Sequence, residues 1–350
     1  MPLPLAPLGL LYGALVRTRL RLYRSGLLKT ESVGAPVISV GNITAGGTGK
    51  TPLVEWAARA VASEGRRTCV LTRGYGRADE RRRVVASDGG RVLAETDECG
   101  DEPRLLAERL LGAASVVCDR DRVAAARWAR ENLGAEVFVL DDGFQHLRIA
   151  RDLDIVTLDA TAPWGGGHML PCGRLREPPR GLTRADCVVI TRAELADDLE
   201  HLRAEVKRLS GGRAAVISSR VRTRGLTLLN PSSDSPSTEL ESRAAGQSAA
   251  AFCAVGNPRA FFEHLRRAGF ELRHTRAFPD HHAFTQGEVG AFAREAERRG
   301  ARALLTTAKD AVKLRGYGFT LPCYVVETEL EFEDEGRLLG LIRGALSVRL

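Results

Sequence analysis

Aromatic residues are scarce in this chain of 350 residues, at 5% of the sequence. No stretch interleaves basic with aromatic side chains, the pattern by which proteins stack on nucleic-acid bases, so we expect no nucleic-acid partner. The seven cysteines are scattered and lack CxxC spacing, which argues against a zinc site and a disulfide framework. We interpret them as reduced cytosolic thiols.

Acidic residues are absent from residues 1–30. The uncharged part ends at Val16, too short to span a bilayer, and the charges follow the apolar run instead of preceding it as in a signal peptide. A helix from about Leu8 would carry an apolar stripe formed by Leu8, Tyr12, Val16, Leu20, Tyr23 and Leu27. Its opposite side would be basic, with Arg17, Arg21 and Arg24. This pattern predicts a helix lying in a membrane interface; the alternative is a helix packed on the protein's own core.

The hydrophobic content of 44% is enough for a substantial core, in one large domain or two ordinary ones. The formal net charge of +7 favours an acidic partner, such as anionic lipid or a phosphorylated substrate.

Short apolar runs alternate with helical patterns from Pro36 to about Val221. The expected strands include VISVGN, VFVLDD and LDIVTLD, and the expected helices include Pro52–Ser63, Glu102–Leu111 and Arg122–Asn132. Continuous apolar strands with helical crossovers predict an α/β fold with a doubly wound, mostly parallel sheet. A polar, Pro/Ser-rich segment at 230–248 predicts a flexible connection to a second, smaller α/β domain.

The segment TAGGTGKT matches the phosphate-binding pattern GxxxxGK[ST] except at its first position, and it consists of Thr44, Ala45, Gly46, Gly47, Thr48, Gly49, Lys50 and Thr51. Its glycines let backbone N–H groups turn toward phosphates, and the helix that follows adds its positive N-terminus. Lys50 would reach the β- and γ-phosphates, and the Thr51 hydroxyl would bind Mg²⁺. We therefore predict a P-loop NTPase-type fold. The alternative is that the segment forms only a tight structural turn.

Two carboxylates follow the apolar run VFVL, at Asp141 and Asp142. They would lie at the C-terminal edge of the sheet, where ligands bind in open α/β folds. One of them should hold Mg²⁺, directly or through water, while the other acts on the acceptor or nucleophile. The alternative is a strand-ending turn with solvated acids.

Several motifs appear in order along the chain, namely GNITAGGTGKTP, TRGYGR, GDEP, LDDGFQH, GRLREP, FPDHHAF and TTAKDAVKL. In this combination the chain resembles the tetraacyldisaccharide 4'-kinase family of lipid A biosynthesis in Gram-negative bacteria. The phosphate loop alone is generic, whereas DDGFQH and DHH in sequence with it are specific. The resemblance extends from the N-terminal helix to about Leu314.

This resemblance implies transfer of the γ-phosphate of ATP, with Mg²⁺, to the 4'-hydroxyl of tetraacyldisaccharide 1-phosphate, which gives lipid IVA. It implies a peripheral or monotopic enzyme on the cytoplasmic face of the inner membrane, with a glycolipid substrate and no obligate protein partner. We accordingly expect a membrane-interface helix at 1–30, a P-loop kinase domain at 31–222 and a smaller α/β domain at 223–350.

The resemblance also implies catalytic residues. The positions matching the family's proton-accepting pair are Asp101 and His281, acting beside Lys50 and Asp142. One sequence leaves open the choice between His281 and His282, and also a carboxylate base assisted by histidine. From the residues alone, Asp101 also suits an N-cap of the helix starting at Glu102, and the two histidines suit a surface turn.

By the same resemblance, a further set of residues lines the disaccharide site: Arg73, Tyr75, Gln145, His146, Arg176 and Glu177. Arg120 and Arg122 either face the lipid headgroup or belong to a solvated helix start. Lys309 and Asp310 lie either near the nucleotide or in a structural ion pair.

Two other functions share the phosphate loop. A GTPase switch needs a guanine-reading element such as NKxD, and TRAE at 191–194 has Arg in place of Lys and Glu in place of Asp. A soluble kinase for a small metabolite would need no N-terminal helix, so it should keep its activity when residues 1–28 are removed.

Overall fold

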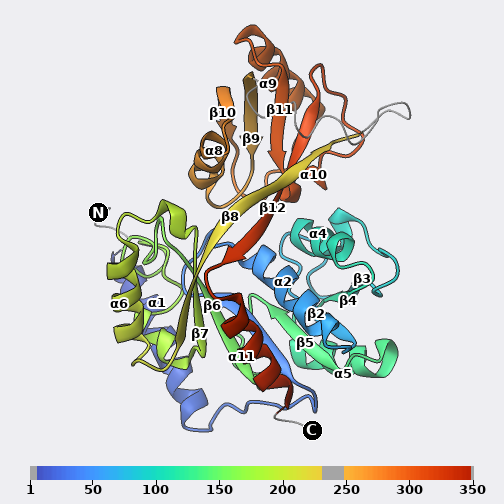
Figure 1. Cartoon of the computed structure of the whole chain (residues 1–350). Coiled ribbons are helices and arrows are strands. Elements are labelled where there is room, and N and C mark those ends of the chain that lie inside the picture. The colour runs from blue at the N-terminus through green and yellow to red at the C-terminus, as the bar shows by residue number, and fades with distance from the viewer. Residues whose placement is uncertain (1–5, 231–247, 348–350) are drawn as a thin grey trace. The chain divides into compact units, whose positions relative to one another are not determined.

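The computed structural model describes residues 6–230 and 248–347 (Figure 1). The chain divides into two compact units. The first comprises Met1–Arg220 together with Leu330–Leu350, and the second comprises Val221–Glu329. Apart from its two end residues, the segment 230–248 that we expected to be flexible lies outside the described residues.

The first unit is built on the predicted parallel sheet. Its strands lie in the order β8 (Ala215–Leu228), β7 (Cys187–Thr191), β6 (Leu153–Asp159), β1 (Val37–Asn42), β5 (Val137–Asp141), β2 (Thr68–Thr72), β4 (Ala114–Cys118) and β3 (Val84–Ser87). Neighbours from β8 to β4 pair in parallel, and only the edge pair of β3 with β4 is antiparallel. The C-terminal ends of β1, β5 and β6 therefore lie together at one edge of the sheet, which is where the predicted site residues follow.

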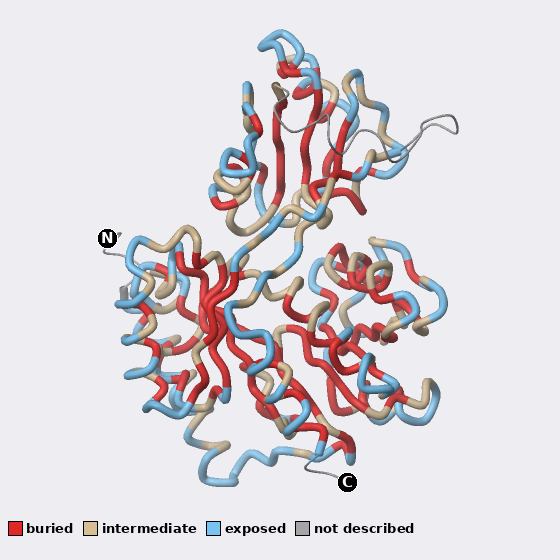
Figure 2. Tube along the Cα trace, viewed as in Figure 1, coloured by how far each residue is buried: buried red, intermediate tan, exposed pale blue. Residues whose placement is uncertain are grey.

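Helices cover both faces of this sheet, as expected for a doubly wound fold (Figure 1). One face is covered by α2 (Lys50–Ser63), α4 (Asp101–Arg109) and α11 (Glu335–Ser347), and the other by α5 (Arg122–Leu133), α6 (Leu199–Leu209) and the 3₁₀ helix η2 (Pro179–Arg184). Successive strand residues point to opposite faces, so Ile155 packs with α2 while Val156 packs with α6. The central strands β1, β5 and β6 are accordingly buried at every residue (Figure 2).

The second unit is a smaller α/β unit, a sheet with helices on both faces. Its strands lie in the order β10 (Glu271–Ala277), β9 (Ser248–Cys253), β11 (Ala303–Thr307), β12 (Cys323–Phe332) and β8, and its helices are α8 (Pro258–Arg267), α9 (Gln286–Arg298) and α10 (Ala308–Ala311). The helix α9 packs on one face of the sheet around Phe252, and α8 packs on the other face around Ala251.

The C-terminal helix differs from the expected boundary, which assigned all of 223–350 to the smaller domain. Leu330–Leu350 belongs to the first unit instead. The reason is apolar packing: Leu338 and Ile342 of α11 are buried in the same cluster as α2. The Phe332 ring also lies 4.9 Å from the ring of Trp56, whose indole N–H donates to Glu335 at 2.8 Å.

The N-terminal helix α1 (Ala6–Arg24) forms as predicted, but its expected lipid-facing stripe is corrected by the structure. The middle members of that stripe, Tyr12, Val16, Leu20 and Tyr23, are partly buried. The hydroxyl of Tyr12 donates to the carbonyl of Arg176 at 3.1 Å, which ties this side of the helix to the first unit. Leu8, the first member of that stripe, is exposed together with three leucines outside it, Leu10, Leu11 and Leu15, by 51 to 72%. The helix therefore has one apolar side against the protein and a second one in solvent.

Among the described residues, no helix combines the length and the apolar character that crossing a bilayer requires. Arg17, Arg21 and Arg24 are exposed on the C-terminal half of α1, as the sequence predicts.

Candidate active site

The phosphate loop connects β1 to α2 as predicted. The helix begins at Lys50, with Thr51 in its first turn, and Gly49 precedes it with φ 80°. Glycine adopts this left-handed conformation without the steric cost that a Cβ would add. The loop thereby places Lys50 and the positive N-terminus of α2 at the edge of the sheet, next to the ends of β5 and β6.

Threonine hydroxyls anchor the underside of the loop. The Thr191 hydroxyl donates to the carbonyl of Thr48 at 2.9 Å, and the Thr48 hydroxyl lies 2.8 Å from that of Thr157. The Asn42 amide also donates to the Thr48 hydroxyl, at 2.9 Å. All four side chains are buried. Thr48 is therefore an anchor of the loop, and its hydroxyl points into the core.

The GRLREP segment runs alongside the first half of the loop. The amide of Ala45 donates to the carbonyl of Arg174 at 2.6 Å, and the amide of Arg176 donates to the carbonyl of Ile43 at 2.8 Å. Thr44, which replaces the first glycine of the motif, is buried in this pairing. As a consequence the Arg176 side chain reaches the end of β5.

Lys50, Asp142 and Arg176 form one charged cluster. The Lys50 ammonium lies 3.1 Å from one carboxylate oxygen of Asp142, and Arg176 donates to both oxygens at 2.8 and 2.6 Å. Asp142 itself has φ 54°, an unusual conformation for a residue other than glycine. Burial raises the pKa of Asp142, but the two cations outweigh it and hold that pKa well below its usual range. Asp142 is therefore ionised.

Asp141 has the opposite electrostatic environment. Burial, followed by the nearby charges of Glu102 and Asp142, raises the pKa of Asp141 to about 6. One carboxylate oxygen accepts a hydrogen bond from the Thr72 hydroxyl at 2.9 Å, while the other is buried without a hydrogen-bond partner. A buried oxygen in this state is suited to a cation.

Asp101 lies at the start of α4 and is buried. It is the first residue of the helix, and Gly100 occupies the N-cap position, so the N-cap alternative for Asp101 does not hold. Gly100 has φ 94°, and a Cβ there would lie 2.8 Å from the carbonyl of Tyr75. This close approach joins the GDEP motif, at the start of α4, to the TRGYGR motif.

The predicted sugar-binding residues have different surroundings. Tyr75 is 62% exposed, and Arg73 is half exposed and pairs with Glu80 at 3.2 Å. Glu177 is only 1% exposed, and its carboxylate accepts hydrogen bonds from Arg184 at 2.8 Å and from the Gln145 amide at 2.7 Å. These contacts suit Glu177 for holding Gln145 in place.

His146 and Arg122 are two further nitrogen-bearing groups near the carboxylates. Burial, assisted by the charge of Arg122, lowers the pKa of His146 to about 4, so the imidazole is neutral at physiological pH. The Nε2 atom of His146 is buried without a hydrogen-bond partner. Arg122 is 5% exposed and donates to the carbonyl of Asp141 at 3.5 Å, whereas Arg120 is exposed.

The second unit contains the DHH motif, and its two histidines differ. His282 lies 3.2 Å from both carboxylate oxygens of Glu288 and stacks on Phe278 at a centroid distance of 5.0 Å. His281 has φ 61°, and its Nε2 lies 3.4 Å from the ammonium of Lys309. His282 is thus held in an aromatic cluster, which leaves His281 as the candidate for chemistry.

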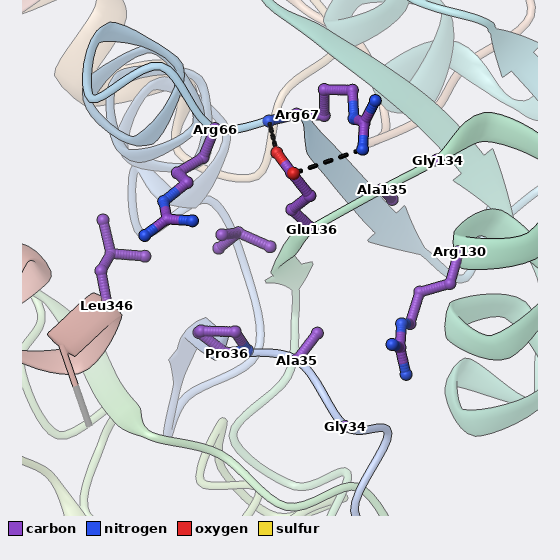
Figure 3. Close-up of a pocket in the computed structure, with 11 residues that line it drawn as sticks. Gly34, Ala35, Pro36, Arg66, Arg67, Arg130, Gly134, Ala135, Glu136 and Leu346 are labelled. Atoms are coloured by element: carbon purple, nitrogen blue, oxygen red, sulfur yellow. Dashed lines mark hydrogen bonds and ion pairs between the residues drawn. The ribbon is translucent and has the colours of Figure 1, made fainter. Parts of the chain in front are cut away.

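The opposite edge of the first sheet has a groove with a different character (Figure 3). It is lined where β1, β2 and β5 begin, by Pro36, Arg66, Arg67, Arg130, Glu136 and Leu346 among others. Arg67 pairs with Glu136 at 3.2 Å, and Arg130 donates to the carbonyl of Val33. No predicted site residue lines this groove.

Sequence reasoning missed Asn42, Thr157, Thr191, Arg184 and Thr72 as parts of the site. Thr72 and Thr191 end apolar runs, and Asn42 ends the strand that leads into the phosphate loop. Polar residues at the C-terminal ends of parallel strands are a signal that finds these three. Arg184 gives no such signal because it reaches Glu177 through the fold of η2.

Comparison with known proteins agrees with this geometry. A family model described as "Tetraacyldisaccharide-1-P 4'-kinase" matches residues 1–347. The tetraacyldisaccharide 4'-kinase of Anaeromyxobacter dehalogenans (strain 2CP-C) is 47% identical over 299 residues, covering 84% of this chain and 76% of the relative. The enzyme of the same name from Geobacter metallireducens is 42% identical over 310 residues, covering 89% and 88%.

A solved structure resembles the whole chain. The crystal structure of LpxK from Aquifex aeolicus in complex with ATP matches with a TM-score of 0.75 at 30% identity, and the match covers 98% of each chain. The chain therefore belongs to the tetraacyldisaccharide-1-P 4'-kinase family.

Proposed function

We propose that this chain transfers the γ-phosphate of ATP to the 4'-hydroxyl of tetraacyldisaccharide 1-phosphate, forming lipid IVA at the cytoplasmic face of the bacterial inner membrane. The observation that carries the proposal is the cluster of Lys50, Asp142 and Arg176, where two cations stand at the phosphate loop beside an ionised carboxylate. Phosphoryl transfer depends on such positioning and charge neutralisation.

The residues present fit Mg²⁺ as the cofactor. Mg²⁺ prefers oxygen ligands and usually takes only one or two carboxylates together with substrate phosphates. The buried Asp141 oxygen without a hydrogen-bond partner and the Thr51 hydroxyl are the donors we assign to it. In the described part of the chain no three acidic, histidine or cysteine side chains form a metal cage, which agrees with a site completed by the nucleotide. Mg²⁺ would neutralise charge on the β- and γ-phosphates.

Asp101 and His281 are the groups we assign to deprotonation of the acceptor hydroxyl. Asp101 is buried at the start of α4 in the first unit, and His281 has a left-handed backbone in the second unit. A carboxylate and an imidazole acting together stabilise the transferred proton better than either does alone. Asp142 is the less suitable base, because Lys50 and Arg176 stabilise its ionised form.

The outward side of α1 supports membrane association. Its exposed leucines, Leu8, Leu10, Leu11 and Leu15, precede the exposed arginines of the same helix. Leucines inserted between acyl chains and arginines near lipid phosphates would hold the enzyme where an acylated substrate lies. Arg73, Tyr75, Gln145, His146 and Arg176 remain our assignment for the disaccharide site, and Glu177 supports Gln145.

The test is incubation of the full chain with labelled ATP and tetraacylated disaccharide 1-phosphate, with the de-acylated sugar as control. We expect label on the lipid, little label on the control sugar, and loss of activity in Lys50→Ala by at least about 10²-fold. Equal labelling of the de-acylated sugar would favour a soluble small-metabolite kinase. Absence of labelled lipid with every acceptor would overturn the proposal.

A further inference from the structure

We propose that Lys309 is a positioning residue that fixes the proton of His281 on Nδ1 and keeps the imidazole neutral. This inference rests on the proposed role of His281 in the phosphoryl transfer. Its basis is the contact of the Lys309 ammonium with Nε2 of His281, at 3.4 Å. An ammonium carries donors only, so it favours a lone pair on the nitrogen that it contacts. Oδ1 of Asp280 also faces Nε2 but lies 3.9 Å away, beyond hydrogen-bond distance.

The loop that carries His281 is fixed from the same side. A single oxygen of Asp280, Oδ1, accepts from the Lys309 ammonium at 3.2 Å and from the backbone amide of His281 at 3.1 Å. The left-handed φ of His281 costs energy, and these contacts hold the residue in it. Asp280, His281 and Lys309 therefore form a compact group in which the lysine sets both the backbone and the ring.

Lys309 is itself held rigidly by its neighbour in the sequence. The Asp310 side chain is fully buried and accepts hydrogen bonds from the amide of Ala254 at 2.9 Å and from the Thr307 hydroxyl at 2.7 Å. Thr307 in turn caps α10 by accepting from the amide of Asp310. This network joins α10 to the end of β9. The Lys309 side chain, only 15% exposed, starts from a fixed backbone and is shielded from solvent.

The two lysines of the TTAKDAVKL motif thus have different tasks. Lys313 lies 3.1 Å from the buried carboxylate of Asp310 and neutralises it. Lys309 instead contacts the DHH motif, through Asp280 and His281. The spacing of four residues separates a lysine that supports the fold from one that supports the catalytic histidine.

The consequence for the reaction concerns which nitrogen faces which group. With Nε2 turned to Lys309, the Nδ1–H group is left to donate a hydrogen bond, which a carboxylate can accept. A carboxylate paired with an imidazole in a fixed tautomer is a known requirement of proton-transfer pairs, since the wrong tautomer removes most of the activity. In the proposed reaction the hydroxyl proton would pass to Asp101, because a neutral His281 whose Nε2 accepts from Lys309 has no lone pair left to take it.

The experiment is ¹⁵N NMR of the histidine rings in the full chain, with the His281 signals assigned by their loss in His281→Gln. We expect the wild type to carry the ring proton on Nδ1, Lys309→Met to shift the distribution toward Nε2, and Lys309→Arg to restore it. The kcat should fall by about tenfold or more in Lys309→Met with unchanged ATP affinity, and should recover in part in Lys309→Arg. Lys207→Met, at an exposed position of α6, is the matched control and should resemble the wild type.

The wild-type spectrum tests the inference by itself, because a His281 ring protonated on Nε2 would overturn it. The inference can therefore be tested even if Lys309→Met folds poorly. An unchanged tautomer and kcat in a folded Lys309→Met would also overturn it. If His281→Gln keeps full activity while the His281 tautomer of the other variants still depends on Lys309, the proposed role of His281 in the reaction is wrong and the positioning by Lys309 stands.

Discussion

The Lys50 ammonium lies 3.1 Å from a carboxylate oxygen of Asp142, so the lysine of the phosphate loop is paired with the carboxylate that follows β5. Arg176 binds the same carboxylate through the GRLREP segment. One anion therefore holds two cations close together, which without it would repel each other. When a triphosphate binds, its oxygens can take over part of this pairing, and the cations are already in place.

Asp142→Asn should lower turnover without weakening ATP binding, because it removes the anion that positions the two cations but leaves their attraction for phosphate. We expect kcat to fall by about 10²-fold or more, because Lys50 and Arg176 lose the anion that orients them. ATP affinity should be retained or increased, since two uncompensated cations attract the triphosphate. Nucleotide titration and steady-state kinetics measure the two effects, and Asp197→Asn on the exposed surface is the control. A parallel loss of ATP binding would contradict this role.

Asp101→Asn and His281→Gln should each reduce turnover far more than ATP affinity. General-base groups contribute about 10²- to 10⁴-fold to rate, and neither residue belongs to the phosphate loop. The measurement is kcat together with the ATP dissociation constant. His282→Gln is the matched control: it breaks the contact with Glu288 and should lower the melting temperature while folded protein keeps its turnover. Equal effects of the two histidine variants on kcat would argue against His281 as the reacting one.

Much of the fold was predictable because its signals are local. The run LDIVTLD is the strand β6 itself, and the predicted helix Arg122–Asn132 differs from α5 by one residue. Strands buried on both faces form near-continuous apolar runs, so both the strands and their parallel arrangement can be recognised from the sequence without knowledge of any contact. The phosphate loop was equally accessible, because its glycines and lysine stand at fixed spacing.

The remainder depends on contacts between distant segments. Nothing in GRLREP indicates that it runs beside residues 43–45, and only that pairing brings Arg176 to Asp142. The return of α11 to the first unit depends on the match between its apolar side and α2. For α1 the helix could be predicted but not its orientation, since leucines on several sides leave the buried side undetermined.

Thr191→Val should weaken ATP binding through the anchoring of the phosphate loop. Valine has the shape of threonine but cannot donate to the Thr48 carbonyl, and a buried acceptor without its partner costs about 1–3 kcal/mol. We expect the ATP dissociation constant to rise by about tenfold, because the loop loses its binding geometry, and Thr191→Ser to restore it. Nucleotide titration gives the result, and Thr183→Val on the surface is the control. Unchanged affinity in Thr191→Val would show that the loop keeps its form without this bond.

The combined substitution of Leu8, Leu11 and Leu15 by glutamine should reduce binding to vesicles of anionic phospholipid. Burial of one leucine contributes about 1.5–3 kcal/mol when complete, so even partial insertion of three should change the partition coefficient by at least about tenfold. ATP affinity and melting temperature should stay the same, because these side chains are exposed. Leu93→Gln and Leu111→Gln, at exposed leucines outside α1, are the matched controls. Undiminished vesicle binding of the triple variant would exclude this side of α1 as the membrane contact.

Asp141→Asn should stabilise the nucleotide-free protein at neutral pH while removing its activity. The pKa of Asp141 is raised to about 6 by burial and by the neighbouring carboxylates. A carboxyl with a raised pKa binds its proton more tightly in the folded state, so its contribution to stability is complete at about pH 4 and below. That contribution is lost as pH rises through about 6, when the buried group ionises.

Asparagine does not titrate, so the advantage of the variant should grow with pH. The rise in the pKa of Asp141 from 3.8 to about 6 corresponds to roughly 2–3 kcal/mol in the free energy of unfolding. This predicts a melting temperature of the variant several degrees above wild type at pH 7.5 and a much smaller difference at pH 4.5. Mg²⁺ with ATP should reverse the order at pH 7.5 if the ionised Asp141 binds the cation, because only the wild type gains from it. Thermal melts at both pH values, with and without Mg²⁺ and ATP, decide the matter. If the difference in melting temperature between variant and wild type does not change with pH, Asp141 is ionised throughout this range, and its unpartnered oxygen has another role.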